Sequence, residues 1–213
     1  LEESLAEAAR SHASLAARAQ PFIDAVASPT PAPGGGSVAA LAGSLAAALG
    51  QMVAGISSKK KSLAAHAPQL ESIEKELQQT CKALAEGIDR DAASFDSVLT
   101  AYRLPRDTAE ASSNRDRAIQ KALVGAVSVP LEMARRGAEV FDTLRQLEPM
   151  AGPSMLSDVR VGRMMAATAV RGALENVNTN LASVTDAAFA SGVRAEVLSL
   201  SIRVGETAVA TGR

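Results

Sequence analysis

The segment from Pro31 to Met52 restricts the possible folds more than any other part of the chain. It reads Pro31-Ala32-Pro33-Gly34-Gly35-Gly36-Ser37 and continues as an alanine-rich run, which two glycines, a serine and a glutamine interrupt. No stretch of eighteen apolar residues occurs, so the run predicts a buried helix rather than a membrane span. Aromatic residues make up only 2% of the chain. A core of such small side chains favours long, closely packed helices and an oligomer interface.

The glycines and Ser37 at the start of this segment predict a binding loop at a helix N-terminus. The prolines fix the approach, the glycines let backbone N–H groups reach a ligand, and Ser37 is a favoured N-cap residue. Such an end attracts an oxyanion or a carbonyl oxygen. The same pattern occurs where two backbones pack closely, so both interpretations stay open. No Gly-Lys-Ser/Thr follows and no strand pattern precedes, which argues against a nucleotide-binding loop.

Helical periodicity runs through the chain, and the alternation typical of strands is nearly absent. The predicted helices span about 2–27, 37–58, 68–101, 108–147, 157–174 and a last segment to 210, with a turn at 149–153. Asp107 or Thr108 caps the fourth helix, and Glu110 completes a capping box. Ser157 caps the fifth, and Pro130 kinks or breaks the fourth. The whole chain, residues 1–213, is therefore predicted to be one all-α domain, a bundle of long antiparallel helices.

Charge and cysteine content narrow the function classes. Twenty-two Lys and Arg against 23 Asp and Glu give a net charge of −1, which argues against binding nucleic acid through bulk charge. The single cysteine, Cys81, excludes an internal disulfide and fits a reducing cytoplasm. His12 and His66 lack ligand spacing, so no metal site is predicted. The chain begins at Leu1, with no initiator methionine and none of the features of a signal peptide. Such a start is also expected for a fragment of a longer polypeptide.

Two groups of acidic residues could carry chemistry. Asp89, Asp91 and Asp96 lie on the third predicted helix, where they form either a proton-transfer carboxylate in a cleft or a solvated acidic face. Asp158 follows Ser157, where a carboxylate is expected to interact with the helix dipole. From spacing alone, the solvated interpretation of the acidic helix is favoured.

Two further groups could bind a ligand. Lys59-Lys60-Lys61 follows the glycine-loop helix and either complements a carboxylated ligand or forms a solvated helix end. Asn176 and Asn180 are one helical turn apart and act either as turn-formers or as ligand contacts. Neither pattern decides between its two interpretations.

Together these segments form six ordered motifs between Phe22 and Phe189 that resemble the folate cyclodeaminase/cyclohydrolase family. The motifs are Ala32-Pro-Gly-Gly-Gly-Ser-Val-Ala-Ala40, Ile88-Asp-Arg-Asp-Ala-Ala-Ser-Phe95, Arg103-Leu-Pro-Arg106, Val127-Ser-Val-Pro-Leu131, Ser157-Asp158 and Gly172-Ala-Leu-Glu-Asn-Val-Asn-Thr-Asn-Leu181. The resemblance implies an all-α homodimer or higher homo-oligomer. It also implies an activity that closes a formimino group on tetrahydrofolate into the 5,10-methenyl ring while ammonia leaves. The related cyclohydrolase activity uses water in place of ammonia.

The resemblance also implies roles for single residues. Asp158 is the first choice for the acid/base group and Asp91 the second. The residues expected to contact the folate, including its polyglutamylated forms, are Gly34, Gly35, Gly36 and Ser37 around the pterin or one-carbon unit, Lys60 and Lys61 at the glutamate carboxylates, and Asn176 and Asn180 at the pterin edge. The substrate is a tetrahydrofolate derivative, and neither a metal nor another cofactor is required. Nucleic acid and membrane are not expected partners.

The chain departs from the family pattern beside two of these motifs. Lys59 stands where the family has a glycine, Ser62-Leu63 where it often has an aromatic residue, and Ala151-Gly152 where it has Gly-Asn. A competing interpretation is therefore an inactive helical dimerisation module attached to another enzyme domain. Saturable folate binding separates the two, because the inactive module would ignore folate.

Overall fold

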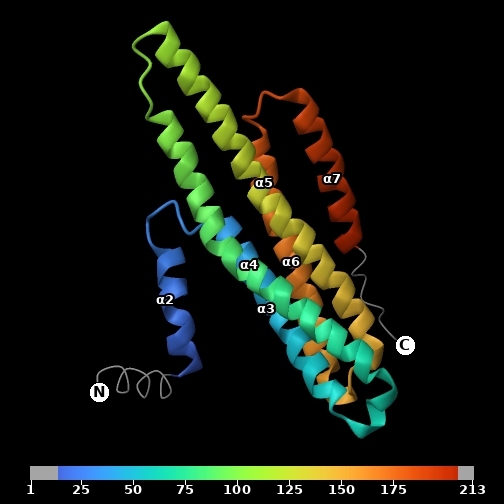
Figure 1. The fold of residues 1–213 in the computed structure, drawn as a ribbon. Helices are drawn as coiled ribbons and strands as arrows, with labels where there is room; N and C mark the ends of the chain where they lie inside the picture. The colour runs from blue at the N-terminus through green and yellow to red at the C-terminus, as the bar shows by residue number, and fades with distance from the viewer. Residues whose placement is uncertain (1–13, 206–213) are drawn as a thin grey trace.

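Four long helices form the body of the molecule in a computed structural model that describes residues 14–205. They are α3 (Gly35–Ser58), α4 (Ala67–Tyr102), α5 (Ala109–Leu147) and α6 (Leu156–Leu181). Figure 1 shows them side by side, with α7 (Ala187–Gly205) against α5 and α6 and with α2 (Leu15–Ala27) standing apart. None of the described residues forms a strand. The predicted all-α bundle is confirmed.

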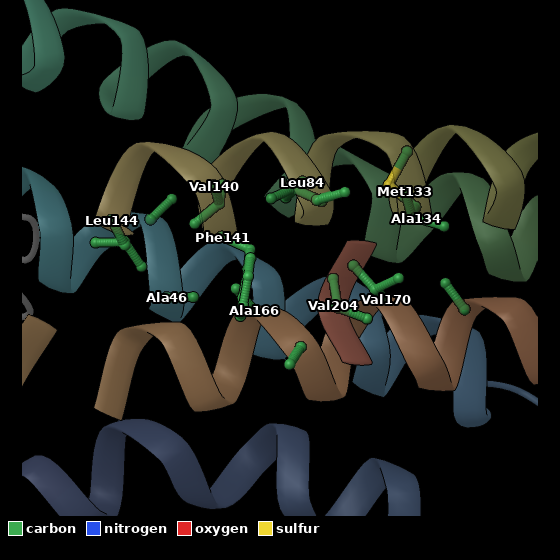
Figure 2. Packing of buried hydrophobic residues seen from close by; sticks show 14 of the residues in the cluster. Ala46, Leu84, Met133, Ala134, Val140, Phe141, Leu144, Ala166, Val170 and Val204 are labelled. Atoms are coloured by element: carbon green, nitrogen blue, oxygen red, sulfur yellow. The ribbon is translucent and has the colours of Figure 1, made fainter. Parts of the chain in front are cut away.

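Small residues of α3 let the other three helices approach closely. Ala40, Ala46 and Ala47 are fully buried, and a Cβ added to Gly50 would lie 2.5 Å from Leu144 of α5 and 2.7 Å from Leu77 of α4. Figure 2 shows the apolar side chains of the bundle meeting at this level. By length and composition α3 could cross a membrane, but 56% of its most apolar window is buried inside the bundle. In the fold it is a core helix, as predicted.

The start of α3 differs from the prediction. The N-cap is Gly34, and the helix begins at Gly35. Ser37 was wrongly predicted to be the cap. Its hydroxyl instead donates to the carbonyl oxygen of Ile88 at 3.0 Å and to Oδ2 of Asp91 at 3.1 Å. A tertiary contact with α4 has therefore replaced the local capping bond.

Two other predicted caps have different outcomes. Thr108 caps α5 as predicted, because its hydroxyl accepts a hydrogen bond from the backbone N–H of Ala111 at 3.0 Å. Glu110 is the second residue of that helix, one position short of the one that a capping box uses. Ser157 was wrongly predicted to cap the fifth helix, since α6 begins at Leu156 with Met155 as its N-cap.

Pro130 does not break α5, which runs unbroken through it. Proline has no N–H, so the carbonyl of Ala126, four residues earlier, loses its usual helical donor. Asn180 of α6 supplies a replacement, because its Nδ2 donates to that carbonyl oxygen at 2.8 Å.

The prediction that the fifth helix ends near Leu174 was wrong. Helix α6 continues to Leu181, so that Asn176 and Asn180 are both helical.

The first predicted helix is correct at its end but not across Ser14. Helix α2 ends at Ala27 as predicted, but it begins at Leu15 after the extended N-cap residue Ser14, so a single helix through this position was wrongly predicted. The predicted helical residues 2–13 lie outside the described range. The predicted turn at 149–153 joins two short 3-10 helices, η2 (Glu148–Met150) and η3 (Pro153–Met155). A third, η1 (Lys61–His66), connects α3 to α4. Helix α7 is described to Gly205, and residues 206–210 lie beyond it.

Candidate functional site

The first turn of α3 packs directly against the carboxylate of Asp91 on α4. Ser37 is fully buried and donates its hydroxyl to Asp91. A Cβ added to Gly36 would lie 2.1 Å from Oδ1 of Asp91. Only a glycine at this position leaves room for the carboxylate where it stands. The glycine-rich segment therefore packs closely against a protein group, and it also presents a helix N-terminus beside a carboxylate.

Helix α6 brings Asn176 to the same place. A Cβ added to the exposed Gly35 would lie 3.5 Å from Nδ2 of Asn176. The Nδ2 group donates to the carbonyl oxygen of Gly172 at 2.9 Å. We call Gly35, Gly36, Ser37, Asp91 and Asn176 the Asp91 cluster. It combines a carboxyl group, a carboxamide and a helix N-terminus, drawn from three helices.

Asp91 differs from its acidic neighbours on α4. Burial raises the pKa of the Asp91 carboxyl above its ordinary value, while hydrogen bonds from the Ser37 hydroxyl and backbone act in the opposite direction. Asp89 and Asp96 are exposed, as the solvated interpretation predicts. Asp91 is half-buried and suited to hold or release a proton near a bound molecule.

Lys60, Lys61 and Asp158, which we call the Lys60 end, lie at the opposite end of the bundle. Asp158 and Asn176 lie 18 positions apart on α6, a distance of about 27 Å along the axis. The Lys60 side chain lies over Gly152, where an added Cβ would be 2.6 Å from Nζ. Within one chain the structure therefore does not bring the Lys60 end together with the Asp91 cluster.

A groove of about 750 Å³ between α4 and α5 is a feature that the sequence analysis missed. Its lining includes the cationic Arg90 and Lys121 and the carboxylate of Asp96. Arg90 is paired with Glu132 at 2.7 Å. Asp91 is not among the lining residues. Small residues at helical spacing on both helices, such as Ala93, Ser97 and Ala101 facing Ala118 and Ala122, were the sequence signal for this groove.

Residues 14–205 contain no group of three His, Cys, Asp or Glu side chains that could hold a metal ion. Cys81 is half-buried, with its Sγ 3.4 Å from the carbonyl oxygen of Ser44. His66 is the exposed residue at the start of α4, and His12 lies outside the described residues. The Asp91 cluster, by contrast, combines a half-buried carboxyl group with a hydroxyl donor and a neighbouring carboxamide.

A family model described as formiminotransferase-cyclodeaminase matches residues 18–199, a range that contains the Asp91 cluster and the Lys60 end. The chain belongs to this family. The match includes each of the six sequence motifs, so the resemblance seen in the sequence is confirmed.

Relatives in this family carry two different names. The chain is 33% identical to a methenyltetrahydrofolate cyclohydrolase of Methylorubrum extorquens, over 87% of this chain and 93% of that protein. It is 32% identical to the formimidoyltransferase-cyclodeaminase of Sus scrofa, over 84% of this chain and 33% of that protein. The chain thus matches about a third of the length of that longer protein. Both relatives place the chain among folate cyclodeaminases and cyclohydrolases.

A solved structure agrees with these sequence relatives. The formiminotetrahydrofolate cyclodeaminase of Thermotoga maritima superposes with a TM-score of 0.79 and 26% identity, over 92% of this chain and 91% of that one. The agreement extends over almost the full length of both chains. The helical bundle is therefore the family's fold.

Proposed function

We propose that the protein is a formiminotetrahydrofolate cyclodeaminase, which forms 5,10-methenyltetrahydrofolate and releases ammonia. The half-buried carboxyl of Asp91, held between Ser37 and the glycine-rich start of α3, is the observation that carries this proposal. The cyclodeaminase named in Thermotoga maritima matches nearly the whole chain, which supports the same choice. The reaction involves no change in oxidation level and so needs no redox cofactor. The proposal includes no metal.

The proposed reaction needs two proton transfers at one carbon. N10 of the folate attacks the carbon of the protonated formimino group on N5, and a tetrahedral intermediate that carries an NH2 group forms. N10 then loses its proton, and the departing nitrogen gains one and leaves as ammonia, so that a methenyl bridge remains. One carboxyl group can accept the first proton and deliver the second. Burial raises the pKa of Asp91 and so favours the protonated form that this delivery requires.

The surrounding groups suit a pterin and its one-carbon unit. The N-terminus of α3 offers backbone donors beside Gly35, and the carboxamide of Asn176 lies within reach of the same place. Asn180 already donates its Nδ2 to α5, which leaves its Oδ1 as the group to face a ligand. We therefore assign Asp91 as the acid/base group. Asp158 is the second candidate, because in one chain it lies about 27 Å from Asn176.

A cyclohydrolase is the second candidate function, favoured by the relative that matches over 93% of its own length. In that reaction water is exchanged at the one-carbon unit, whereas the cyclodeaminase releases ammonia there. The same carboxyl group could transfer protons in both reactions. We place the protein in the cytoplasm as a homo-oligomer that acts on free or polyglutamylated folate. Neither nucleic acid nor membrane is a proposed partner.

The test follows the absorbance of 5,10-methenyltetrahydrofolate. Purified protein is given 5-formiminotetrahydrofolate in one cuvette and the methenyl compound in another. A rise in absorbance with ammonia release in the first supports the cyclodeaminase. Faster loss of absorbance in the second, with no reaction in the first, supports the cyclohydrolase. Folded protein that is silent in both would contradict both proposals and leave the inactive dimerisation module.

A further inference from the structure

The packing of α3 against α4 follows a regular pattern that ends at Asp91. Three glycines of α3 recur every seven residues, and each lies against a side chain of α4 that recurs with the same spacing: Gly50 against Leu77, Gly43 against Leu84 and Gly36 against Asp91. The two leucines are buried in the core. The third contact is instead made by the carboxyl group of the candidate site, which accepts a hydrogen bond from Ser37.

Phe95 continues this face of α4 beyond the beginning of α3. It follows Asp91 by four residues, which makes the two side chains neighbours on one face of the helix. The seven-residue pattern would set position 32 opposite Phe95, but α3 begins only at Gly35. In Figure 1, α4 and α5 extend together past that point. The face of α4 that α3 covers as far as Asp91 is therefore not covered by α3 at Phe95.

The ring of Phe95 is an exposed aromatic surface beside the candidate site. Phe95 is 37% exposed, and it belongs to neither of the two buried apolar clusters of residues 14–205. Aromatic side chains in a helix point back toward the preceding turn, so the ring of Phe95 is directed toward Asp91. A ligand bound at the Asp91 carboxyl therefore has an apolar ring next to it, against which a second flat ring can stack.

We propose that Phe95 binds the pterin of the folate by stacking and so holds the one-carbon unit at Asp91. This inference rests on the proposed function, because it takes the ligand to be a folate. The pyrimidine half of a reduced pterin is flat and carries its polar groups around its edge. Phe95 provides a surface for the face of that ring, and the Asn176 carboxamide and the N-terminus of α3 provide hydrogen-bonding groups for its edge. The p-aminobenzoyl ring has no such edge, so these polar groups favour the pterin.

Tyr102 is a second exposed aromatic residue of α4 and serves as the matched control. It follows Phe95 by seven residues on the same face and is 48% exposed. Its ring already has a partner, because the guanidinium carbon of Arg115 lies 5.6 Å from the ring centroid. Tyr102 is also about 16 Å from Asp91 along the helix axis. A pterin whose one-carbon unit lies at Asp91 therefore stacks on Phe95 and not on Tyr102.

Equilibrium binding of 5-formyltetrahydrofolate, which carries a formyl group in place of the formimino group, tests the stacking without turnover. Phe95→Leu keeps an apolar side chain but removes the ring, so the Kd should rise by about 10-fold. Phe95→Tyr keeps the ring and should bind as the wild type does, and Tyr102→Leu should stay within about twofold. With 5-formiminotetrahydrofolate, Phe95→Leu should raise KM by a similar factor and change kcat less, because stacking acts on the bound substrate and the transition state alike.

Three results of these measurements would overturn the inference. The first is a wild-type Kd in Phe95→Leu, and the second is equal weakening of binding in Tyr102→Leu. The third is a change in the oligomeric mass of Phe95→Leu without a change in Kd, because another protein chain would then cover the ring.

Fluorescence gives a readout that a purely structural role of Phe95 would not change. The chain contains no tryptophan, so Phe95→Trp and Tyr102→Trp each introduce a single indole. Bound 5-formyltetrahydrofolate should protect the indole of Phe95→Trp from quenching by iodide and leave that of Tyr102→Trp accessible. Equal protection of both indoles would overturn the inference. A wild type that binds no folate would contradict the proposed function itself, whereas normal turnover with unchanged binding in Phe95→Leu would contradict only the role of Phe95.

Discussion

The two ends of α3 are built in different ways. At the N-terminal end, the Asp91 carboxyl is half-buried and accepts a hydrogen bond from Ser37, and the absence of a side chain at Gly36 leaves room for it. At the C-terminal end, Lys61 is exposed, Lys60 is half-buried between α3 and η1, and Asp158 is half-buried in the first turn of α6. The first end is organised within one chain around a carboxyl group, whereas the second carries cationic side chains. On this difference we base the proposal that proton transfer occurs at Asp91 and carboxylate binding at Lys60.

Among substitutions that leave the side chain of Asp91 itself unchanged, the largest effect that would sharpen this contrast is expected for Gly36→Ala. An added Cβ would collide with the tip of the Asp91 side chain, which can rotate away, so the fold survives while the carboxyl is displaced. Turnover should fall by roughly 10- to 100-fold, a part of the roughly 100- to 10,000-fold that a positioned acid/base group contributes. Gly125→Ala is the control, because nothing lies within 4 Å of its added Cβ. Equal turnover in both variants would show that Gly36 is not needed to position the Asp91 carboxyl.

A smaller effect is expected at the Lys60 end. Lys60→Gln removes the charge that we assign to a folate carboxylate, and KM should rise by about 10-fold with little change in kcat. Lys75→Gln, an exposed lysine of α4, is the matched control. A fall in kcat with unchanged KM would place Lys60 in the chemical step and break the division between the two ends.

Asn180 should act on stability, since its amide replaces the donor that Pro130 lacks. Asn180→Ala should lower the free energy of unfolding by about 1 kcal/mol. Pro130→Ala restores a backbone N–H for Ala126, so Asn180→Ala should cost less in that background. Urea unfolding of the four proteins measures this coupling. Additive losses in the free energy of unfolding would show that Asn180 does not compensate for the missing backbone donor at Pro130.

The smallest effect concerns the pH dependence of stability. Because burial raises the pKa of Asp91, its contribution to stability is present below the unfolded pKa of about 3.9 and is lost as pH rises through the folded pKa. Asp91→Asn should therefore unfold at the same or a slightly higher Tm than the wild type at pH 7, with a smaller difference at pH 4. A clear loss of Tm at pH 7 would instead identify the ionised carboxylate as a stabilising group.

Most of the fold follows from local sequence signals. Helical periodicity, prolines and the Thr108 cap gave the order of the helices and most of their ends. The errors arose where tertiary contacts replace local ones. Ser37 donates a hydrogen bond to α4 instead of capping its own helix. Asn180 of α6 supplies the hydrogen-bond donor that Pro130 of α5 lacks. Neither partner can be identified from neighbouring residues in the sequence.

The candidate site was predictable in its members but not in its arrangement. The motifs named Asp91, the glycines and Asn176, and these residues do gather in one place. The resemblance also assigned roles to Asp158 and Lys60, which lie at the opposite end of the bundle from the cluster. The order of the motifs along the sequence does not show which helix ends lie next to each other in the bundle.

The most direct test compares turnover by Asp91→Asn with turnover by Asp89→Asn, an exposed carboxylate two residues away on the same helix. Both variants are assayed with 5-formiminotetrahydrofolate and with the methenyl compound. We predict that Asp91→Asn loses about 100-fold or more of kcat and that Asp89→Asn stays within about twofold of the wild type. Near-normal turnover by folded Asp91→Asn, together with a large loss in Asp158→Asn, would contradict the account and move the chemistry to the other end of α3.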